Sequence, residues 1–212
     1  MPTPATLAAI IITLCFAAGL NVYATIFSLG LMARLHWIVL PDTLHILTSL
    51  WVVVASGIFF AAEFVADKIP GFDLAWNALH TFIRIPVAAL MAYAAGSHLS
   101  PGMHILVTCI GASIAAIAHS SKSALRVVVT PSPEPISNIA LSTGEDAVAV
   151  GLSWLALHHA MLAGATVLVL SIACLITLYL SFHLVKKSFR WLSTDRRGAA
   201  GATSITPLRP TD

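Results

Sequence analysis

Residues 160–185 read AMLAGATVLVLSIACLITLYLSFHLV, and Lys186 and Lys187 follow directly. A helix that crosses a membrane needs roughly 20 mainly apolar residues, so this stretch predicts a membrane span that ends at a basic boundary. The rest of the chain has the same character, because 58% of its 212 residues are hydrophobic and 9% are charged, with a mean hydropathy of +0.91. Soluble domains carry about 25% charged residues. The sequence therefore predicts an integral membrane protein.

The apolar stretches predict an all-α, polytopic helix bundle of about six spans. Residues 1–185 then form a transmembrane helical domain, and residues 186–212 form a basic cytoplasmic tail that has too little apolar content to pack and is expected to be disordered. The six predicted spans cover residues 5–33, 44–66, 73–97, 102–121, 139–158 and 160–185.

The distribution of charge predicts the orientation. Six of the 11 Lys and Arg residues lie after residue 185, and the positive-inside rule places such a cluster in the cytoplasm. An even number of spans then puts both termini on the cytoplasmic side of an inner membrane. Because the positive charge belongs to a tail beside the membrane and not to a patch on a folded domain, we expect no nucleic-acid partner.

Acidic side chains mark the end of the second predicted span. Glu63 and Asp67 are four residues apart, so they share one helical face, and Lys68 follows. At a helix C-terminus both carboxylates oppose the helix macrodipole, so local helix stability does not explain them. They are either satisfied by Lys68 and cytoplasmic water, or they belong to a site inside the bundle.

A polar stripe runs along the third predicted span, at intervals of three and four residues. Such a stripe cannot face lipid. Arg84 lies roughly 16 Å along the helix from Asp73 at 1.5 Å per residue, and an unpaired arginine near mid-bilayer costs at least about 2.5–3.5 kcal/mol. We therefore expect a carboxylate partner from another span, first Glu63 or Asp67 and next Glu145 or Asp146. The stripe consists of Asp73, Asn77, His80, Thr81 and Arg84.

A third polar stretch follows the fourth predicted span. Three prolines among five residues (131–135) exclude a regular helix, and irregular backbone at membrane depth is tolerated only where protein or a watery cavity surrounds it. A pocket or a re-entrant segment meets this condition. The alternative for the acids is a capping box, because Ser142 precedes Glu145 by three residues. The polar residues here are His119, Lys122, Arg126, Glu134, Ser137, Asn138, Glu145 and Asp146.

The placement of these stretches fits three spans followed by three, which would make an inverted 3+3 repeat. The first span is interrupted at residues 19–23 (GLNVY), and the fourth ends in polar residues from His119 to Arg126. Acids end the second span and begin the fifth. No residue-for-residue identity demonstrates the duplication.

Several long motifs are specific enough to compare with known families. They are Glu63-Phe64-Val65-Ala66-Asp67-Lys68-Ile69-Pro70, the run from Trp76 to Arg84, and His119, Lys122, Arg126, Ser132-Pro133-Glu134-Pro135, Ser137-Asn138, Ser142 and Glu145-Asp146. These motifs resemble a bacterial membrane family, the domain of unknown function 4126. The resemblance covers about residues 15–160 and implies a membrane protein without implying an activity.

A weaker likeness is to the lysine-exporter-like superfamily, whose cation exporters carry an acid and then Gly-Asp-Lys in each inverted half. Here Asp67-Lys68 follows Glu63 with no glycine before the aspartate, and Gly144-Glu145-Asp146 has no lysine after it. The likeness therefore points toward transport without fixing a mechanism.

The sequence as a whole favours a transporter or permease for a small ion or polar solute, in which intramembrane acids bind the ion and basic residues act as counter-ions. A lipid-handling protein that binds anionic head groups and a non-transporting structural or assembly subunit remain alternatives. No catalytic motif is present, so we expect neither an enzyme nor a cofactor; metal binding and homo-oligomerisation are left open. The expected partners are the bilayer and the solute. The candidate binding residues are Glu63, Asp67, Lys68, Asp73, Asn77, His80, Arg84, His119, Lys122, Arg126, Glu134, Ser137, Asn138, Glu145 and Asp146.

Overall fold

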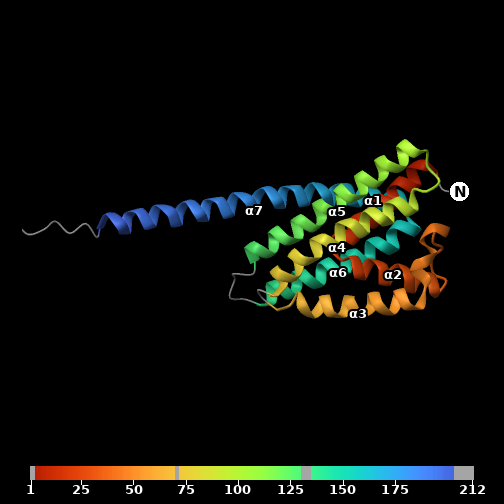
Figure 1. Cartoon of the computed structure of the whole chain (residues 1–212), viewed down its shortest axis with the longest axis horizontal. Coiled ribbons are helices and arrows are strands. Elements are labelled where there is room, and N and C mark those ends of the chain that lie inside the picture. Colours follow the sequence, from red (N-terminus) through yellow and green to blue (C-terminus); the bar gives the residue numbers. More distant parts are fainter. Residues whose placement is uncertain (1–2, 70–71, 130–134, 203–212) are drawn as a thin grey trace, which may run out of the picture.

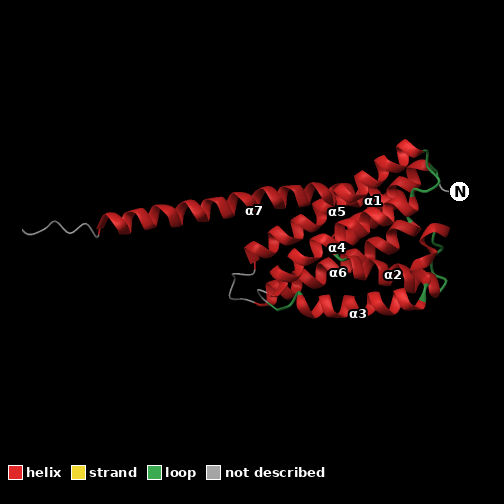
Figure 2. Cartoon of the chain, viewed as in Figure 1, coloured by secondary structure: helices red, strands yellow, loops and turns green. Residues whose placement is uncertain are grey.

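A computed structural model of the chain describes residues 3–69, 72–129 and 135–202; for residues 73, 129, 135, 138 and 188–202 it describes the backbone only. Within these ranges the chain is helical and contains no strand (Figure 2), as the sequence predicts. The elements are α1 (Pro4–Leu20), α2 (Val22–Arg34), the 3-10 helix η1 (Asp42–Thr48), α3 (Leu50–Ala66), α4 (Phe72–Ala95), α5 (Pro101–Val129), α6 (Pro135–His158) and α7 (Ala160–Ala202).

The helices make this a membrane protein. Segments of α4 (Leu74–Ala95), α5 (Pro101–Val128) and α7 (Ala160–Lys187) are each long and apolar enough to cross a bilayer. A fourth crossing is added if η1 and α3, which meet at an angle of 64°, form one broken span. The predicted number of six spans is therefore not confirmed, and the inverted repeat stays a prediction.

The first predicted span, residues 5–33, is wrong as a single crossing, because α1 and α2 form a hairpin (Figure 1). Along α2, the ring of Tyr23 stacks on Phe59, with centroids 5.1 Å apart, and Arg34 Nη1 donates to the Thr48 carbonyl over 2.9 Å. Helix α2 thus runs antiparallel to α3. Leu7 near the start of α1 lines one hollow with Leu40 and with Ala95 at the end of α4. The beginning of α1 and the end of α2 therefore lie at the same end of the bundle.

Asn21 is the physical reason for the reversal. Its backbone is extended (φ −150°, ψ 103°), and its side-chain oxygen accepts a hydrogen bond from the Ala24 N–H over 2.9 Å. It thereby ends α1 and caps the N-terminus of α2, and asparagine is among the preferred residues for that position. The apolar residues on both sides look alike whether the chain continues or turns back, so the sequence showed the interruption but not the reversal.

The hairpin changes the path of the chain relative to the predicted topology. Helices α3 to α7 run back and forth along the bundle, so α7 leaves it at the end opposite to the N-terminal end of α1 (Figure 1). The prediction that both termini lie on one side of the membrane depended on a single first span, and the hairpin removes that basis.

Helix α1 lies at the centre of the bundle and packs against α4, α5, α6 and α7. Its residues from Thr13 to Leu20 are all buried. A Cβ atom on Gly19 would lie 2.5 Å from the Ala115 carbonyl oxygen on α5, so α1 and α5 touch through their backbones at this point. This close packing fixes the depth of the hairpin tip.

Helix α7 extends beyond the rest of the bundle (Figure 1). It continues to Ala202, past residue 186 where the sequence places the start of the tail. Residues 203–212 lie outside the described part of the chain.

Candidate functional site

Charged side chains from four helices meet beside the tip of the hairpin, and we refer to them as the charged cluster. Six of the seven residues are buried, and the side chain of the seventh, Glu145, is 10% exposed. The charged cluster consists of Glu63 and Asp67 (α3 and its C-cap), Arg84 (α4), Lys122 and Arg126 (α5), and Glu145 and Asp146 (α6).

The acids at the end of α3, Glu63 and Asp67, face two basic residues of α5, Lys122 and Arg126, and each pair is spaced by four residues. Asp67 caps the C-terminus of α3, and its N–H donates to the Glu63 carbonyl over 2.8 Å. Lys122 and Arg126 are also four apart and therefore occupy one face of α5. The two cations offset the unfavourable position of the two carboxylates at the negative end of a helix dipole.

Lys122 is the centre of the charged cluster. Its Nζ lies 2.8 Å from Asp67 Oδ2, 3.4 Å from Glu63 Oε1 and 3.4 Å from Glu145 Oε2. It also donates to the backbone carbonyl of Leu20, the last residue of α1, over 3.3 Å. One ammonium thus joins α3, α6 and the end of α1.

Arg126 connects the acids of α3 with those of α6. Its Nη2 lies 3.3 Å from Asp67 Oδ2 and 2.9 Å from Glu145 Oε2, while Nη1 donates to the Asp67 carbonyl over 2.9 Å. With Lys122 it forms a lattice in which two cations share two carboxylates. Such shared pairing offsets part of the cost of removing these charges from water.

Arg84 has the carboxylate partner that the sequence predicts. Its Nη2 donates to Glu63 Oε1, and both side chains are fully buried. Its Nη1 donates to Asn77 Oδ1 on the same helix and to His119 Nδ1 on α5, each over 3.1 Å. The predicted polar stripe on α4 therefore faces the bundle interior.

The two histidines extend this network with neutral hydrogen bonds. Because His119 Nδ1 accepts from Arg84, its Nε2–H donates to Thr81 Oγ1, over 2.7 Å. His80 Nδ1 lies 2.7 Å from the Trp76 carbonyl, so this nitrogen carries the hydrogen and Nε2 accepts from the Tyr23 hydroxyl over 3.3 Å. These partners assign the tautomers and join α4 to α5 and α2.

The tip of the hairpin takes part in the site directly. Asn21, which is completely buried, donates from Nδ2 to Asp146 Oδ1 over 2.8 Å. Together with the bond from Lys122 to the Leu20 carbonyl, this contact ties the tip to α5 and α6. A change at Asp146 therefore acts on the tip of the hairpin.

Most of the predicted binding residues meet at this site, and some do not. Lys68 lies apart from the charged cluster: its Nζ donates to the Phe64 carbonyl over 2.9 Å and lies 3.0 Å from the centre of the Phe64 ring. Ser137 is exposed at the start of α6. The side chains of Asp73 and Asn138, and all of Glu134, lie outside the described part. The residues that meet are Glu63, Asp67, Asn77, His80, Arg84, His119, Lys122, Arg126, Glu145 and Asp146.

The list drawn from the sequence omits Asn21 and Tyr23. Both lie in the interruption at residues 19–23, so a signal was present in the sequence. It did not identify a site because the partners, Asp146 and His80, are far along the chain.

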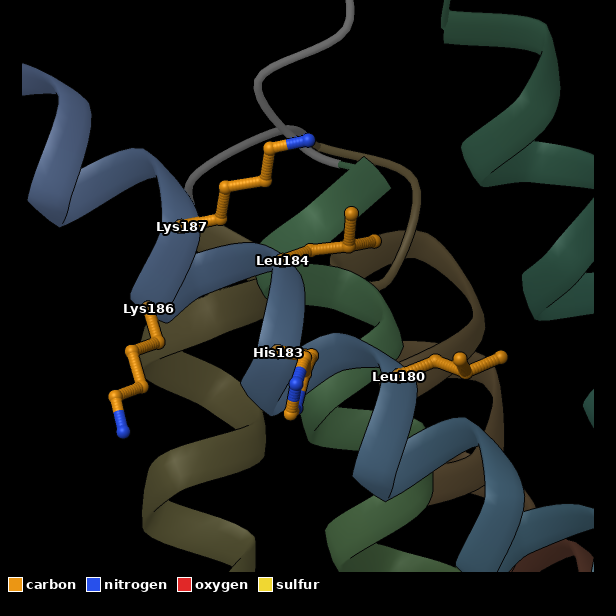
Figure 3. A pocket seen from close by; sticks show the side chains of 5 residues that line it. All are labelled: Leu180, His183, Leu184, Lys186 and Lys187. Atoms are coloured by element: carbon orange, nitrogen blue, oxygen red, sulfur yellow. The ribbon is translucent and has the colours of Figure 1, made fainter.

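A second polar feature lies on α7, where a surface hollow is lined by Leu180, His183, Leu184, Lys186 and Lys187. Figure 3 shows the two leucines and Lys187 projecting to one side of the helix and Lys186 to the other. Apolar side chains with lysines beyond them are typical of the level where a span leaves the bilayer.

The described residues contain no group of three or more His, Cys, Asp or Glu side chains placed to hold a metal ion. What the charged cluster presents instead is carboxylates paired with guanidinium and ammonium groups. Chemically, it can exchange one cationic partner for another, or gain and lose protons.

Comparisons with known proteins agree with the resemblance seen in the motifs. A family model described as domain of unknown function (DUF4126) matches residues 8–198. No curated protein and no solved structure matches the chain. The weaker likeness to the lysine-exporter-like superfamily receives no support from these comparisons.

Proposed function

The chain belongs to the family of domain of unknown function 4126, whose description names no activity, and we propose from the charged cluster that it is a membrane transporter or permease for a small ion or polar solute. In this function the protein moves its substrate across the membrane without converting it chemically, and it is not an enzyme.

The observation that supports this proposal is the burial of the charged cluster among membrane-embedded helices. Bringing charges out of water costs several kcal/mol for each ion, and well-packed apolar side chains often give equal or greater stability than a buried ion pair. Stability alone is thus a poor reason to keep such residues. Ionisable residues inside membrane bundles instead commonly mark ion and proton pathways.

The hairpin supports the same function. Broken helices whose ends meet inside the membrane form the ion and substrate sites of many transporters, because helix ends and unwound backbone supply partial charges there. Here the end of α1 contacts Lys122 and the tip residue Asn21 contacts Asp146. In the proposed mechanism the acids bind the cation or exchange protons while Arg84, Lys122 and Arg126 act as alternating counter-ions. The proline inside α4, Pro86, is a candidate hinge.

The alternative of a lipid-handling protein rests on the lysines of α7. Lys122 and Arg126 are buried and already paired with carboxylates, which leaves Lys186 and Lys187, near the hollow on α7, to attract an anionic head group. A structural or assembly subunit is the third alternative.

For orientation, we propose an inner-membrane location with the basic end of α7 in the cytoplasm, following the positive-inside rule. Because α1 begins at the end of the bundle opposite to the basic end of α7, we propose that the N-terminal end of α1 lies on the outer side, in place of the expectation that both termini are cytoplasmic.

The test is reconstitution of the full chain into liposomes, followed by flux measurements with protons, alkali cations, small polar solutes and labelled lipids. Transport predicts flux of an ion or solute above that of empty liposomes, and a loss of at least about ten-fold in Glu63→Gln. Asp42→Asn is the matched control, because the side chain of Asp42 is 99% exposed and lies outside the charged cluster. Lipid movement without ion or solute flux would favour the lipid-handling alternative, and no movement of any kind would favour the structural one.

A further inference from the structure

The charged cluster contains more acids than bases. Glu63, Asp67, Glu145 and Asp146 provide four carboxylates, whereas Arg84, Lys122 and Arg126 provide three cations. Lys68 adjoins Asp67 in the sequence; its ammonium is directed to the Phe64 ring and carbonyl, and it acts on Asp67 and Asp146 only through space, without an ion pair among the described contacts. With all seven groups ionised, the charged cluster lacks one positive charge. In a medium of low dielectric constant such a shortfall is costly.

Among the described residues, Asp146 is the carboxylate of the charged cluster that lacks a cationic partner within 4 Å. Glu63, Asp67 and Glu145 each lie within 4 Å of a basic group, whereas Asp146 receives its hydrogen bond from the neutral amide of Asn21. Asp146 is 5% exposed, and its second oxygen, Oδ2, has no hydrogen-bond partner among the described residues. A buried carboxylate in this position needs a proton or a bound cation to be stable.

A second unsatisfied oxygen lies one helical turn away. Ser142 is completely buried, and its Oγ also has no hydrogen-bond partner among the described residues. Because Ser142 and Asp146 are four residues apart on α6, they share one face of the helix. This face carries the contact with the hairpin tip through Asn21. Two buried oxygens without hydrogen-bond partners among the described residues, next to the hairpin tip, can take up a proton or supply two of the oxygen ligands of a small cation.

We infer that Asp146 and Ser142, closed on one side by Asn21, bind a single monovalent cation, either a proton or a small alkali ion, at the tip of the α1–α2 hairpin. This inference rests on the proposed function and names the class of ion that uses it. A proton bonds to the Asp146 carboxyl, and an alkali ion is ligated by Asp146 Oδ2 and Ser142 Oγ.

Other ionisable groups around Asp146 set how strongly this site binds a positive charge. The positive charges of Lys122 and Lys68 oppose binding of a cation at Asp146, whereas the negative charges of Glu63 and Asp67 favour it. When the bound cation leaves, the uncompensated charge of Asp146 attracts the ammonium of Lys122, which donates a hydrogen bond to the end of α1. Binding is thereby coupled to the position of the hairpin.

The test measures thermal unfolding of the full-length protein in detergent, first as a function of pH and then in lithium, sodium or potassium against choline at constant ionic strength. The wild type and the exposed control Asp42→Asn are expected to respond alike. Asp146→Asn, which has the shape and charge of the protonated acid, is expected to fold and to lose the response. A pH response without an alkali response identifies the proton, and the reverse identifies the alkali ion.

Ser142→Ala provides the second variant, because it keeps the charge of Asp146 and removes one oxygen. Its response should require about five-fold more of the cation for the same effect, as expected for the loss of one hydrogen bond or ligand. If Asp146→Asn does not fold, the result with Ser142→Ala tests the inference by itself. In that case, a cation-response midpoint of Ser142→Ala equal to that of the wild type overturns the inference. An unchanged response in Asp146→Asn, or no response in the wild type, also overturns it. A wild type that responds but moves no ion in liposomes leaves this site standing and removes the transport proposal.

Discussion

The Nζ of Lys122 lies 3.3 Å from the carbonyl oxygen of Leu20, the last residue of α1. The C-terminus of a helix carries a partial negative charge on its unsatisfied carbonyls, so the end of α1 is a fourth negative group around this ammonium, beside three carboxylates. Lys122 therefore stabilises the hairpin and the acids at once.

Replacing this ammonium should be costly. In Lys122→Met, the carboxylates of Glu63, Asp67 and Glu145 and the end of α1 lose a shared cation, and we expect a loss of about 3–5 kcal/mol, measured as a lower unfolding temperature in detergent. Lys68→Met is the matched control, because Lys68 lies on the Phe64 ring outside the charged cluster; its loss should cost no more than about 1 kcal/mol. Equal effects of the two substitutions would contradict the central position of Lys122.

The pair of Arg84 and Glu63 allows a double-mutant test. Arg84→Gln leaves Glu63 with the weaker partner Lys122 at 3.4 Å, so we expect a loss toward the lower end of about 3–5 kcal/mol. Adding Glu63→Gln removes the uncompensated charge and should restore most of the stability, as measured by thermal unfolding. Purely additive losses in the double variant would show that the two residues do not act as a pair. Restored stability without restored flux would assign the pair to the working site.

The close approach of α1 and α5 gives a prediction about packing. In Gly19→Ala the new methyl group would meet the Ala115 backbone at 2.5 Å, and overpacking of this kind costs about 1–3 kcal/mol. In the control Gly151→Ala, nothing lies within 4 Å of the new atom, and the change should be neutral or stabilising by up to about 1 kcal/mol. The measurement is the apparent unfolding temperature of both variants. A Gly19→Ala variant as stable as the wild type would mean that α1 does not pack closely against α5.

The reversal of the chain at Asn21 is tested by labelling single cysteines from each side of the membrane, in a background without Cys15, Cys109 and Cys174. Cysteines at Thr3 and Ser100 should react from the same side, because the start of α1 and the end of α4 share one end of the bundle. A cysteine at Lys187 should react from the other side. Labelling of Thr3 and Lys187 from one side would restore a first span that crosses the membrane.

The sequence predicted which charged residues of the site need partners better than it predicted the course of the chain through the bundle. An arginine on a polar stripe requires a carboxylate, so Glu63 was correctly named as a partner of Arg84. Lys68 was grouped with its neighbour Asp67, but its ammonium is directed to the Phe64 ring, because adjacent residues point about 100° apart at a helix end. The hairpin was missed because apolar residues on both sides of Asn21 satisfy the criteria for a span, and the bond that identifies the tip, from Asn21 to Asp146, joins residues 125 positions apart.

The central position of α1 has a consequence for how the protein is made. The groups that satisfy its inner end are Lys122, which binds the Leu20 carbonyl, and Asp146, which binds Asn21, and both are synthesised after it. Helix α7, which also packs on α1, is synthesised last. A nascent hairpin that presents the Leu20 carbonyl and Asn21 to lipid would leave polar groups unsatisfied, at several kcal/mol each. The first 34 residues thus reach their final depth only after translation has passed residue 146. Until then, the start of the chain depends on the insertion machinery to shield its polar groups from lipid. A truncated chain that ends before α6 should therefore be degraded by quality-control proteases.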